Sequence, residues 1–198
     1  MEEKKTIEMA ELMGSSVKDK LNYCGKDVNV YPLAKIIHPE CAEIDDHVGI
    51  YDNSWIDAKP SLKIGKYSVV VYGALIEGWG NKEIGQRVFI GPGAKILAST
   101  TVLNGHYGVP MPEVEGAQEV NYGGVKICDD AYIGAGSVVM PGVTIGEGAV
   151  VGANSFVARN LKPWGIYFGN PCKLIGMREK PSEELRSKVE KLDWTSNI

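Results

Sequence analysis

An apolar residue recurs at every sixth position through the C-terminal half of the chain. The positions of this run are Ile127, Ile133, Val139, Ile145, Val151 and Val157. The same period occurs in three earlier runs that are separated by slips in the spacing: Ile44, Ile50, Ile56 and Leu62; Ile64, Val70 and Ile76; Ile84, Ile90 and Ile96. A period of six matches neither the alternation of an amphipathic strand nor the 3.6-residue turn of a helix.

A six-residue period has a simple physical explanation. A short strand followed by a tight turn forms one flat side of a coil, and its apolar anchor points inward. Three sides complete a triangular coil of roughly 18 residues, and coils stack at the ~4.8 Å spacing of paired strands. Glycine is frequent, at 24 of 198 residues, and supplies the backbone conformations that corners require. The pattern therefore predicts an all-β fold, a parallel β-helix built from hexapeptides.

The residues inside these hexapeptides are themselves distinctive. Blocks such as Ile133-Gly-Ala-Gly-Ser-Val and Ile145-Gly-Glu-Gly-Ala-Val resemble the hexapeptide repeat of left-handed parallel β-helix acyltransferases. The segment from Pro163 to Lys173, which ends in Gly-Asn-Pro-Cys-Lys, resembles the closing segment of the branch that acetylates sugars and xenobiotics. The resemblance covers about residues 36–178. It implies a left-handed β-helix that assembles as a homotrimer, with active sites between subunits.

The two ends of the chain depart from the repeat. Apolar residues at helical spacing predict a helical arm over residues 1–30, with a candidate break at Gly14. Residues 31–178 are the expected β-helix, which carries an extruded loop at 103–124. A serine followed by two acids predicts a capped C-terminal helix within residues 179–198. We expect both ends to pack as short helical appendages.

The extruded loop contains no repeat and is rich in glycine and proline. A long irregular loop on a regular scaffold is usually functional. It holds His106, and the resemblance implies that a histidine in this loop is the general base that deprotonates the acceptor. Asn104 and Tyr107 are candidates for binding the acceptor and are equally suited to support the fold. The carboxylate that orients the histidine stays open among Glu77, Glu113, Glu115 and Glu119.

The acyl donor implied by the resemblance is acetyl-CoA, held in a groove along the coils. Position-wise match to the family places Ala135, Ala153, Ala158 and Arg159 in that groove and Lys173 at the phosphate end. Small corner residues let the pantetheine arm approach the backbone, whose N–H and C=O groups pair with its amides. The alternatives are corner packing for the alanines and a solvated surface charge for the lysine.

Further positions stay open. The family carries a basic residue where this sequence has Gly176, so Arg178 is the candidate substitute. Trp164 is a candidate to stack on the adenine, with a core or lid position as the alternative. Tyr72 and Trp79 are candidates for stacking on a sugar and are equally suited to the fold.

Composition narrows the class of protein. The chain carries 21 basic and 25 acidic residues, interspersed, for a net charge of −4, so we expect no nucleic-acid partner. No apolar run approaches the ~18 residues that a membrane span needs. The four cysteines lie far apart without a C-x-x-C pair. That spacing argues against a zinc site or a disulfide framework, and it favours a cytoplasmic protein.

The resemblance implies an acetyl-CoA-dependent O- or N-acetyltransferase that acts on a sugar or sugar nucleotide, for surface polysaccharide biosynthesis, without a required metal. The alternatives are a noncatalytic β-helix assembly module and a γ-type carbonic anhydrase. A carbonic anhydrase of that type needs three histidines on zinc. The three histidines here, at 38, 47 and 106, lack a closely spaced pair, and we interpret His38 and His47 as structural.

Overall fold

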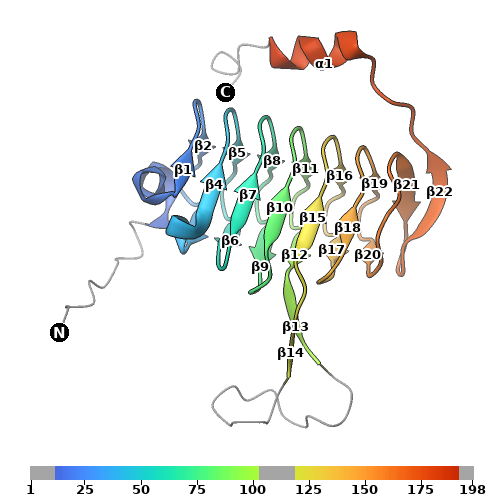
Figure 1. Cartoon of the computed structure of the whole chain (residues 1–198), viewed down its shortest axis with the longest axis horizontal. Coiled ribbons are helices and arrows are strands. Elements are labelled where there is room, and N and C mark those ends of the chain that lie inside the picture. The colour runs from blue at the N-terminus through green and yellow to red at the C-terminus, as the bar shows by residue number, and fades with distance from the viewer. Residues whose placement is uncertain (1–11, 103–118, 192–198) are drawn as a thin grey trace.

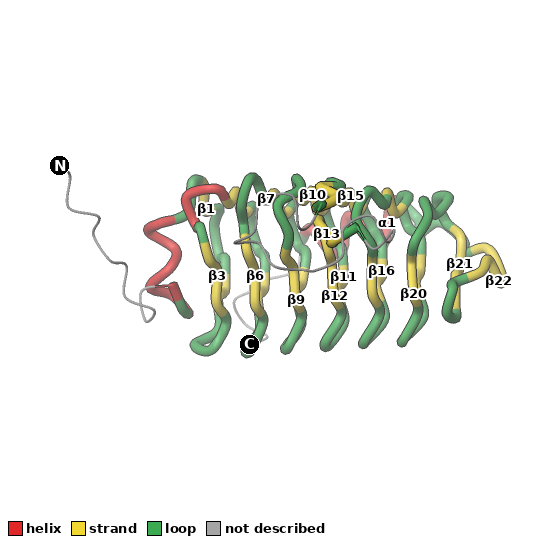
Figure 2. The backbone as a smooth tube through the Cα atoms, turned by 90° about the horizontal axis from the view of Figure 1, so that it is seen from below, coloured by secondary structure: helices red, strands yellow, loops and turns green. Residues whose placement is uncertain are grey.

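The computed structural model describes residues 12–102 and 119–191, and most of these residues form one stack of coils (Figure 1). Short strands follow one another around three flat faces. Each strand pairs in parallel with the strand one coil away, except for an antiparallel closing strand and a protruding antiparallel pair. Seen from below, the strands of one face run across the stack at regular intervals (Figure 2).

The three faces contain the following strands. Face 1 consists of β1 (Tyr23–Cys24), β4 (Ala42–Ile44), β7 (Leu62–Ile64), β10 (Lys82–Ile84), β15 (Val125–Ile127) and β18 (Thr144–Ile145). Face 2 consists of β2 (Asn29–Val30), β5 (Gly49–Ile50), β8 (Val69–Val70), β11 (Phe89–Ile90), β16 (Tyr132–Ile133), β19 (Val150–Val151), β21 (Gly165–Phe168) and β22 (Lys173–Met177). Face 3 consists of β3 (Lys35–Ile37), β6 (Trp55–Asp57), β9 (Leu75–Glu77), β12 (Lys95–Leu97), β17 (Val138–Val139) and β20 (Phe156–Val157).

The apolar anchors of the hexapeptides fill the interior. Each one, from Ile44 to Val157, has an exposed fraction of 4% or less. Truncating a buried isoleucine to alanine generally costs about 2–5 kcal/mol of stability, so the columns of anchors dominate the folding energy. The predicted left-handed parallel β-helix is confirmed, and its polar backbone groups pair between coils.

Coil length differs along the stack. Ile44, Ile64 and Ile84 lie in register on face 1, so the N-terminal coils are 20 residues long. Ile127 and Ile145 are paired neighbours, so the C-terminal coils have 18 residues. The slips in the hydrophobic period mark the two additional residues, which lie at the corner where the chain passes from face 3 to face 1.

The N-terminal end differs from the expected helical arm over residues 1–30. A 3-10 helix, η2, spans Gly14–Lys20, and Val17 within it is fully buried at the open end of the stack. Strands β1 and β2 already pair with β4 and β5, so the β-helix begins before residue 31. Gly14, the candidate break, begins η2 with a φ of 56°. Residues 1–11 lie outside the described part of the chain.

The extruded loop has a strand-paired stem. β13 (Ser99–Thr101) and β14 (Val120–Tyr122) pair antiparallel, and the pair extends away from the coils (Figure 1). The expectation of an irregular loop over residues 103–124 was therefore wrong for β14. Glycine and proline are absent from its three residues, and pairing with β13 supplies the backbone partners that an isolated segment lacks.

The C-terminal end carries the predicted capped helix. α1 spans Glu183–Glu190, and the Ser182 hydroxyl accepts a hydrogen bond from the Leu185 N–H at 3.3 Å. The helix lies on the opposite side of the stack from the β13–β14 pair (Figure 1). Arg186 anchors it through ion pairs of 2.8 Å to Asp130 and 3.2 Å to Glu147. Among the described helices, none has the length and apolar character required to cross a membrane.

Candidate functional site

Departures from the regular coil gather at one edge of the stack. We call this edge the ribbon corner, and it consists of the described residues between face 3 and face 1: 38–41, 58–61, 78–81, 98–102, 119–124, 140–143 and 158–160. The three N-terminal coils have their additional residues here, and the β13–β14 pair leaves from the same corner. In the described coils the other two corners keep short, regular turns, so the departures from the repeat gather at the ribbon corner.

The predicted catalytic and acceptor-binding residues lie beyond this stem. His106, Asn104 and Tyr107 belong to residues 103–118, which are outside the described part of the chain. The chain leaves the stem at Val102, whose N–H donates to the Glu119 carbonyl at 2.8 Å. The roles predicted for these three residues therefore stay predictions, and the structure describes only the strands that flank them in the sequence, β13 and β14.

Two of the predicted acetyl-CoA residues stack on one another at the corner between face 2 and face 3. Ala135 and Ala153 occupy equivalent turns of adjacent coils, and the Asn154 N–H donates to the Ala135 carbonyl at 2.8 Å. The coils approach so closely that a Cβ added at Gly134 would lie 2.5 Å from the Ala153 nitrogen. Ala153 is exposed and Ala135 is half-buried, so this corner offers backbone to a ligand with little side-chain obstruction.

Lys173 lies close to these alanines. It begins β22 and is exposed, and the N–H of its neighbour Cys172 donates to the Phe156 carbonyl of β20 at 2.9 Å. Ala158 and Arg159 are exposed at the far end of β20, at the ribbon corner. The structure therefore places the five predicted residues at the two ends of the last face 3 strands, with Lys173 on the side of Ala135 and Ala153.

Arg178 and Trp164 lie at a different corner, between face 1 and face 2. Arg178 donates to the Asp130 carbonyl at 3.1 Å, and its guanidinium carbon lies 6.0 Å from the centre of the Trp164 ring. Lys180 and Arg186 also approach that ring, which is only 7% exposed. These contacts favour the core position for the tryptophan and give the arginine a structural partner.

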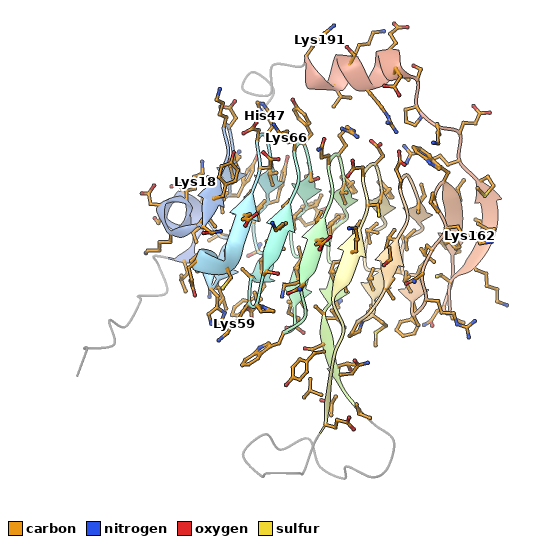
Figure 3. The ribbon with its side chains drawn as sticks, viewed as in Figure 1. Lys18, His47, Lys59, Lys66, Lys162 and Lys191 are labelled. Carbon is orange, nitrogen blue, oxygen red and sulfur yellow. The ribbon has the colours of Figure 1, made fainter. Side chains whose placement is uncertain are left out.

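A polar cluster at the ribbon corner was missed by the sequence analysis. His38 Nδ1 lies 2.8 Å from Asp57 Oδ1, and the same oxygen accepts the Lys59 N–H at 3.0 Å. Lys59 lies at the same end of the coils as the β13–β14 pair (Figure 3). The histidine and the aspartate are 19 residues apart, about one coil, so only the coil length could have revealed this contact.

Lys82 is buried in this cluster with an exposed fraction of 1%. Its Nζ donates to three carbonyl oxygens, those of Gly78, Lys59 and Gly80, at 2.5, 2.6 and 3.1 Å. Burial lowers the pKa of the Lys82 ammonium, and the carboxylate of Asp57 opposes that shift. The signal in the sequence was a lysine where the stacked strands place leucine and valine.

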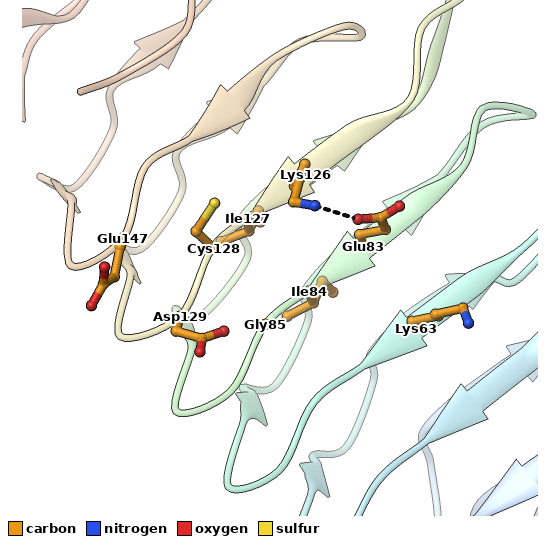
Figure 4. A pocket seen from close by; sticks show the side chains of 9 residues that line it. All are labelled: Lys63, Glu83, Ile84, Gly85, Lys126, Ile127, Cys128, Asp129 and Glu147. Atoms are coloured by element: carbon orange, nitrogen blue, oxygen red, sulfur yellow. Dashed lines mark hydrogen bonds and ion pairs between the residues drawn. The ribbon is translucent and has the colours of Figure 1, made fainter. Parts of the chain in front are cut away.

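A separate hollow of about 480 Å³ lies on face 1 (Figure 4). Its rim includes an ion pair between Lys126 and Glu83 at 2.9 Å, and its lining contains none of the residues predicted to bind acetyl-CoA. Cys128 also lines it, and burial raises the pKa of that thiol, so the cysteine is not an activated nucleophile. Among the described residues, no group of three or more His, Cys, Asp or Glu side chains could hold a metal ion.

Comparison with known proteins agrees with this fold. Residues 124–159 match the family described as bacterial transferase hexapeptide (six repeats). A probable macrolide acetyltransferase of Lysinibacillus sphaericus is 42% identical over 72 residues, which are 36% of this chain and 39% of that protein. The putative acetyltransferase YvoF of Bacillus subtilis is 31% identical over 105 residues, 53% of this chain and 56% of that protein. The matches thus span between about two fifths and just over half of these relatives.

Solved structures extend the similarity over most of the chain. A single-residue mutant of AntD, an N-acyltransferase from Bacillus cereus in complex with dTDP and coenzyme A, superposes with a TM-score of 0.82 at 26% identity. That similarity covers 93% of this chain and 99% of AntD. A maltose O-acetyltransferase from Clostridium difficile 630 shares the fold, with a TM-score of 0.60, 21% identity and coverage of 83% and 74%. Residues 124–159 thus carry the hexapeptide repeat of that family, and the resemblance of this chain to hexapeptide-repeat acyltransferases is confirmed.

Proposed function

We propose that this protein is an acetyl-CoA-dependent O- or N-acetyltransferase whose acceptor is a sugar or a sugar nucleotide. The observation that carries the proposal is the similarity to AntD, an N-acyltransferase with bound dTDP and coenzyme A, over nearly the whole length of both chains. A noncatalytic assembly module would not need the β13–β14 pair that interrupts the coils. We further propose a role in surface polysaccharide biosynthesis in the cytoplasm.

The proposed donor site runs along face 3. Ala135 and Ala153 expose the backbone of stacked turns to the pantetheine arm, and Ala158 and Arg159 line the opposite end of the same strands. Lys173, exposed beside the last coil, is the proposed partner of the phosphate end. A lysine ammonium suits this role because it binds phosphate as a point charge without demanding a fixed geometry.

The proposed reaction is a direct transfer. His106 accepts the proton of the acceptor hydroxyl or amine, and the freed lone pair attacks the thioester carbonyl of acetyl-CoA. Backbone N–H groups stabilise the oxyanion of the tetrahedral intermediate. Its collapse breaks the carbon–sulfur bond and releases the coenzyme A thiolate, which takes up the proton. No covalent enzyme intermediate and no metal takes part.

The proposed active unit is a homotrimer. The β13–β14 pair extends away from the coils, which supports a site completed by a neighbouring subunit (Figure 1). Light scattering at micromolar concentration should therefore give about three times the chain mass. A mass of 21.5 kDa, that of one chain, would contradict the proposal.

Lys173→Glu should weaken coenzyme A binding without unfolding the protein. A reversed charge repels the phosphates, and the exposed position at the start of β22 contributes little to the core. Isothermal titration calorimetry should show a dissociation constant at least tenfold higher, equivalent to about 1.4 kcal/mol. Lys162→Glu, at another exposed turn, is the matched control and should leave the affinity unchanged. Equal affinities of wild type and Lys173→Glu for coenzyme A would show that Lys173 does not belong to the coenzyme A site.

His106→Ala should lower kcat by roughly 10²–10⁴-fold, the usual contribution of a general base. Coenzyme A affinity and the melting temperature should hardly change. In the wild type, kcat/KM should fall toward acid pH as the imidazole becomes protonated and loses its capacity to accept a proton. The mutant should lose this acid limb. Retention of more than about a tenth of wild-type turnover would exclude His106 as the base.

A further inference from the structure

Trp79 is a large aromatic side chain that the fold displays instead of burying. It is 57% exposed and lies in the turn between β9 and β10, at the ribbon corner. The Trp79 N–H donates to the Ser99 hydroxyl at 3.3 Å, and Ser99 is the first residue of β13. The tryptophan is therefore attached directly to the base of the stem that carries the predicted catalytic loop.

The turn that holds Trp79 fits tightly against the stem. Gly80 has no room for a Cβ atom, since one added there would collide with the Ala98 carbonyl and lie 2.8 Å from Gly123. Gly78 has a φ of 100°, and a Cβ there would collide with the Ser99 nitrogen. Both flanks of the tryptophan are thus fixed by backbone contacts with the two segments of the chain that enter and leave the stem.

Lys82 fixes the same turn from the inside. Its buried ammonium binds the carbonyls of Gly78 and Gly80, one on each side of Trp79, and a third carbonyl from Lys59 in the coil before. A buried charge is expensive unless its hydrogen bonds are satisfied, and here three carbonyls satisfy it. A leucine or valine at this position, as in the stacked strands, would give a simpler core but would leave the turn unanchored.

The surroundings of the indole suit a ring-shaped polar ligand. The Lys59 ammonium lies 5.0 Å from the centre of the Trp79 ring, which is the geometry of a cation–π contact. The same lysine can meet an anionic group of a ligand that stacks on the indole. His38 and Asp57 continue the polar surface, because Asp57 accepts one hydrogen bond from the Lys59 backbone and contacts His38.

We propose that Trp79 is a stacking platform for a ring of a sugar-nucleotide acceptor, and that Lys82 is the positioning residue that holds this platform at the base of the stem. This inference rests on the proposed function and adds the place where the acceptor binds. In either case one face of a ligand ring lies against the indole. That ring is the pyranose or the nucleobase of the acceptor. The π-face of tryptophan accepts either ring, and the adjacent ammonium favours an acceptor that carries phosphate.

The test uses the full-length protein and two probes, dTDP-4-amino-4,6-dideoxyglucose and dTDP. In calorimetry, Trp79→Ala should raise the dissociation constant of the sugar nucleotide about five- to a hundredfold, the usual loss for one stacked ring. Trp79→Phe should keep most of the affinity. If the ring is the nucleobase, dTDP should lose the same factor; if it is the pyranose, dTDP should be unaffected.

Trp55→Ala is the matched control. Trp55 is also exposed, at 41%, and also lies beneath a lysine, with Lys35 Nζ at 4.6 Å, but it is on a regular strand of face 3 away from the stem. Its removal should leave the affinity for dTDP-4-amino-4,6-dideoxyglucose unchanged. Three results would contradict the proposal that Trp79 is a stacking platform. These are an equal loss of affinity in both variants, no loss of affinity in Trp79→Ala, and no binding of the probe to the wild type.

Lys82→Met tests the positioning role. It should raise the KM of dTDP-4-amino-4,6-dideoxyglucose by a factor similar to that of Trp79→Ala, with kcat and the dissociation constant of coenzyme A nearly unchanged. If Lys82 had only a structural role, Lys82→Met would lower the fraction of active protein, and therefore kcat, without a selective rise in the KM of the acceptor. Failure of the proposed function is distinct, since the wild type would then bind no coenzyme A and transfer no acetyl group, whatever the state of the platform.

Discussion

The parallel pairing of each coil with the next is the constraint on which the rest of this structure depends. Backbone groups of one strand find their partners one coil away, so the strands of a face must stay in register along the stack. A change in register would move the inward anchors to the outside. Additional residues can therefore be accommodated only between strands, at a corner, and here they are all accommodated at the same corner.

That constraint explains why the scaffold and the candidate site are separate. Faces 1 to 3 repeat, and their buried columns provide the stability. Strand register does not fix the number of residues at the ribbon corner. This corner holds the additional residues of the N-terminal coils, the β13–β14 pair and the cluster around Lys82. A buried ammonium and glycine turns are local costs that a stack of this depth can sustain.

The hydrophobic period predicted the scaffold because each six-residue period corresponds to one side of a coil. Each anchor from Ile44 to Val157 is buried as expected, and the slips in spacing coincide with N-terminal coils that are two residues longer than the expected 18. The period carries no information about contacts across a corner. The pairing of His38 with Asp57 needed the 20-residue coil length, and the three carbonyls around Lys82 needed the backbone of two turns.

The ends and the stem were harder to predict for a different reason. β1 and β14 are two and three residues long, too short to show a period, and they are strands only because a neighbour pairs with them. Helical spacing of apolar residues therefore predicted an arm that reached too far into the first coil. Tertiary pairing overrides local preference most readily in segments as short as these.

The central claim is that the coils supply the fold and that the β13–β14 pair at the ribbon corner is required for the proposed acetyl transfer. The most direct measurement replaces residues 98–124 with the two residues found at 141–142, the equivalent turn of the next coil, so that the coil continues without the β13–β14 pair. Cooperative thermal unfolding should persist within a few degrees of wild type, while acetyl transfer from acetyl-CoA to dTDP-4-amino-4,6-dideoxyglucose should disappear. Continued acetyl transfer by this variant, or collapse of its fold, would contradict the account.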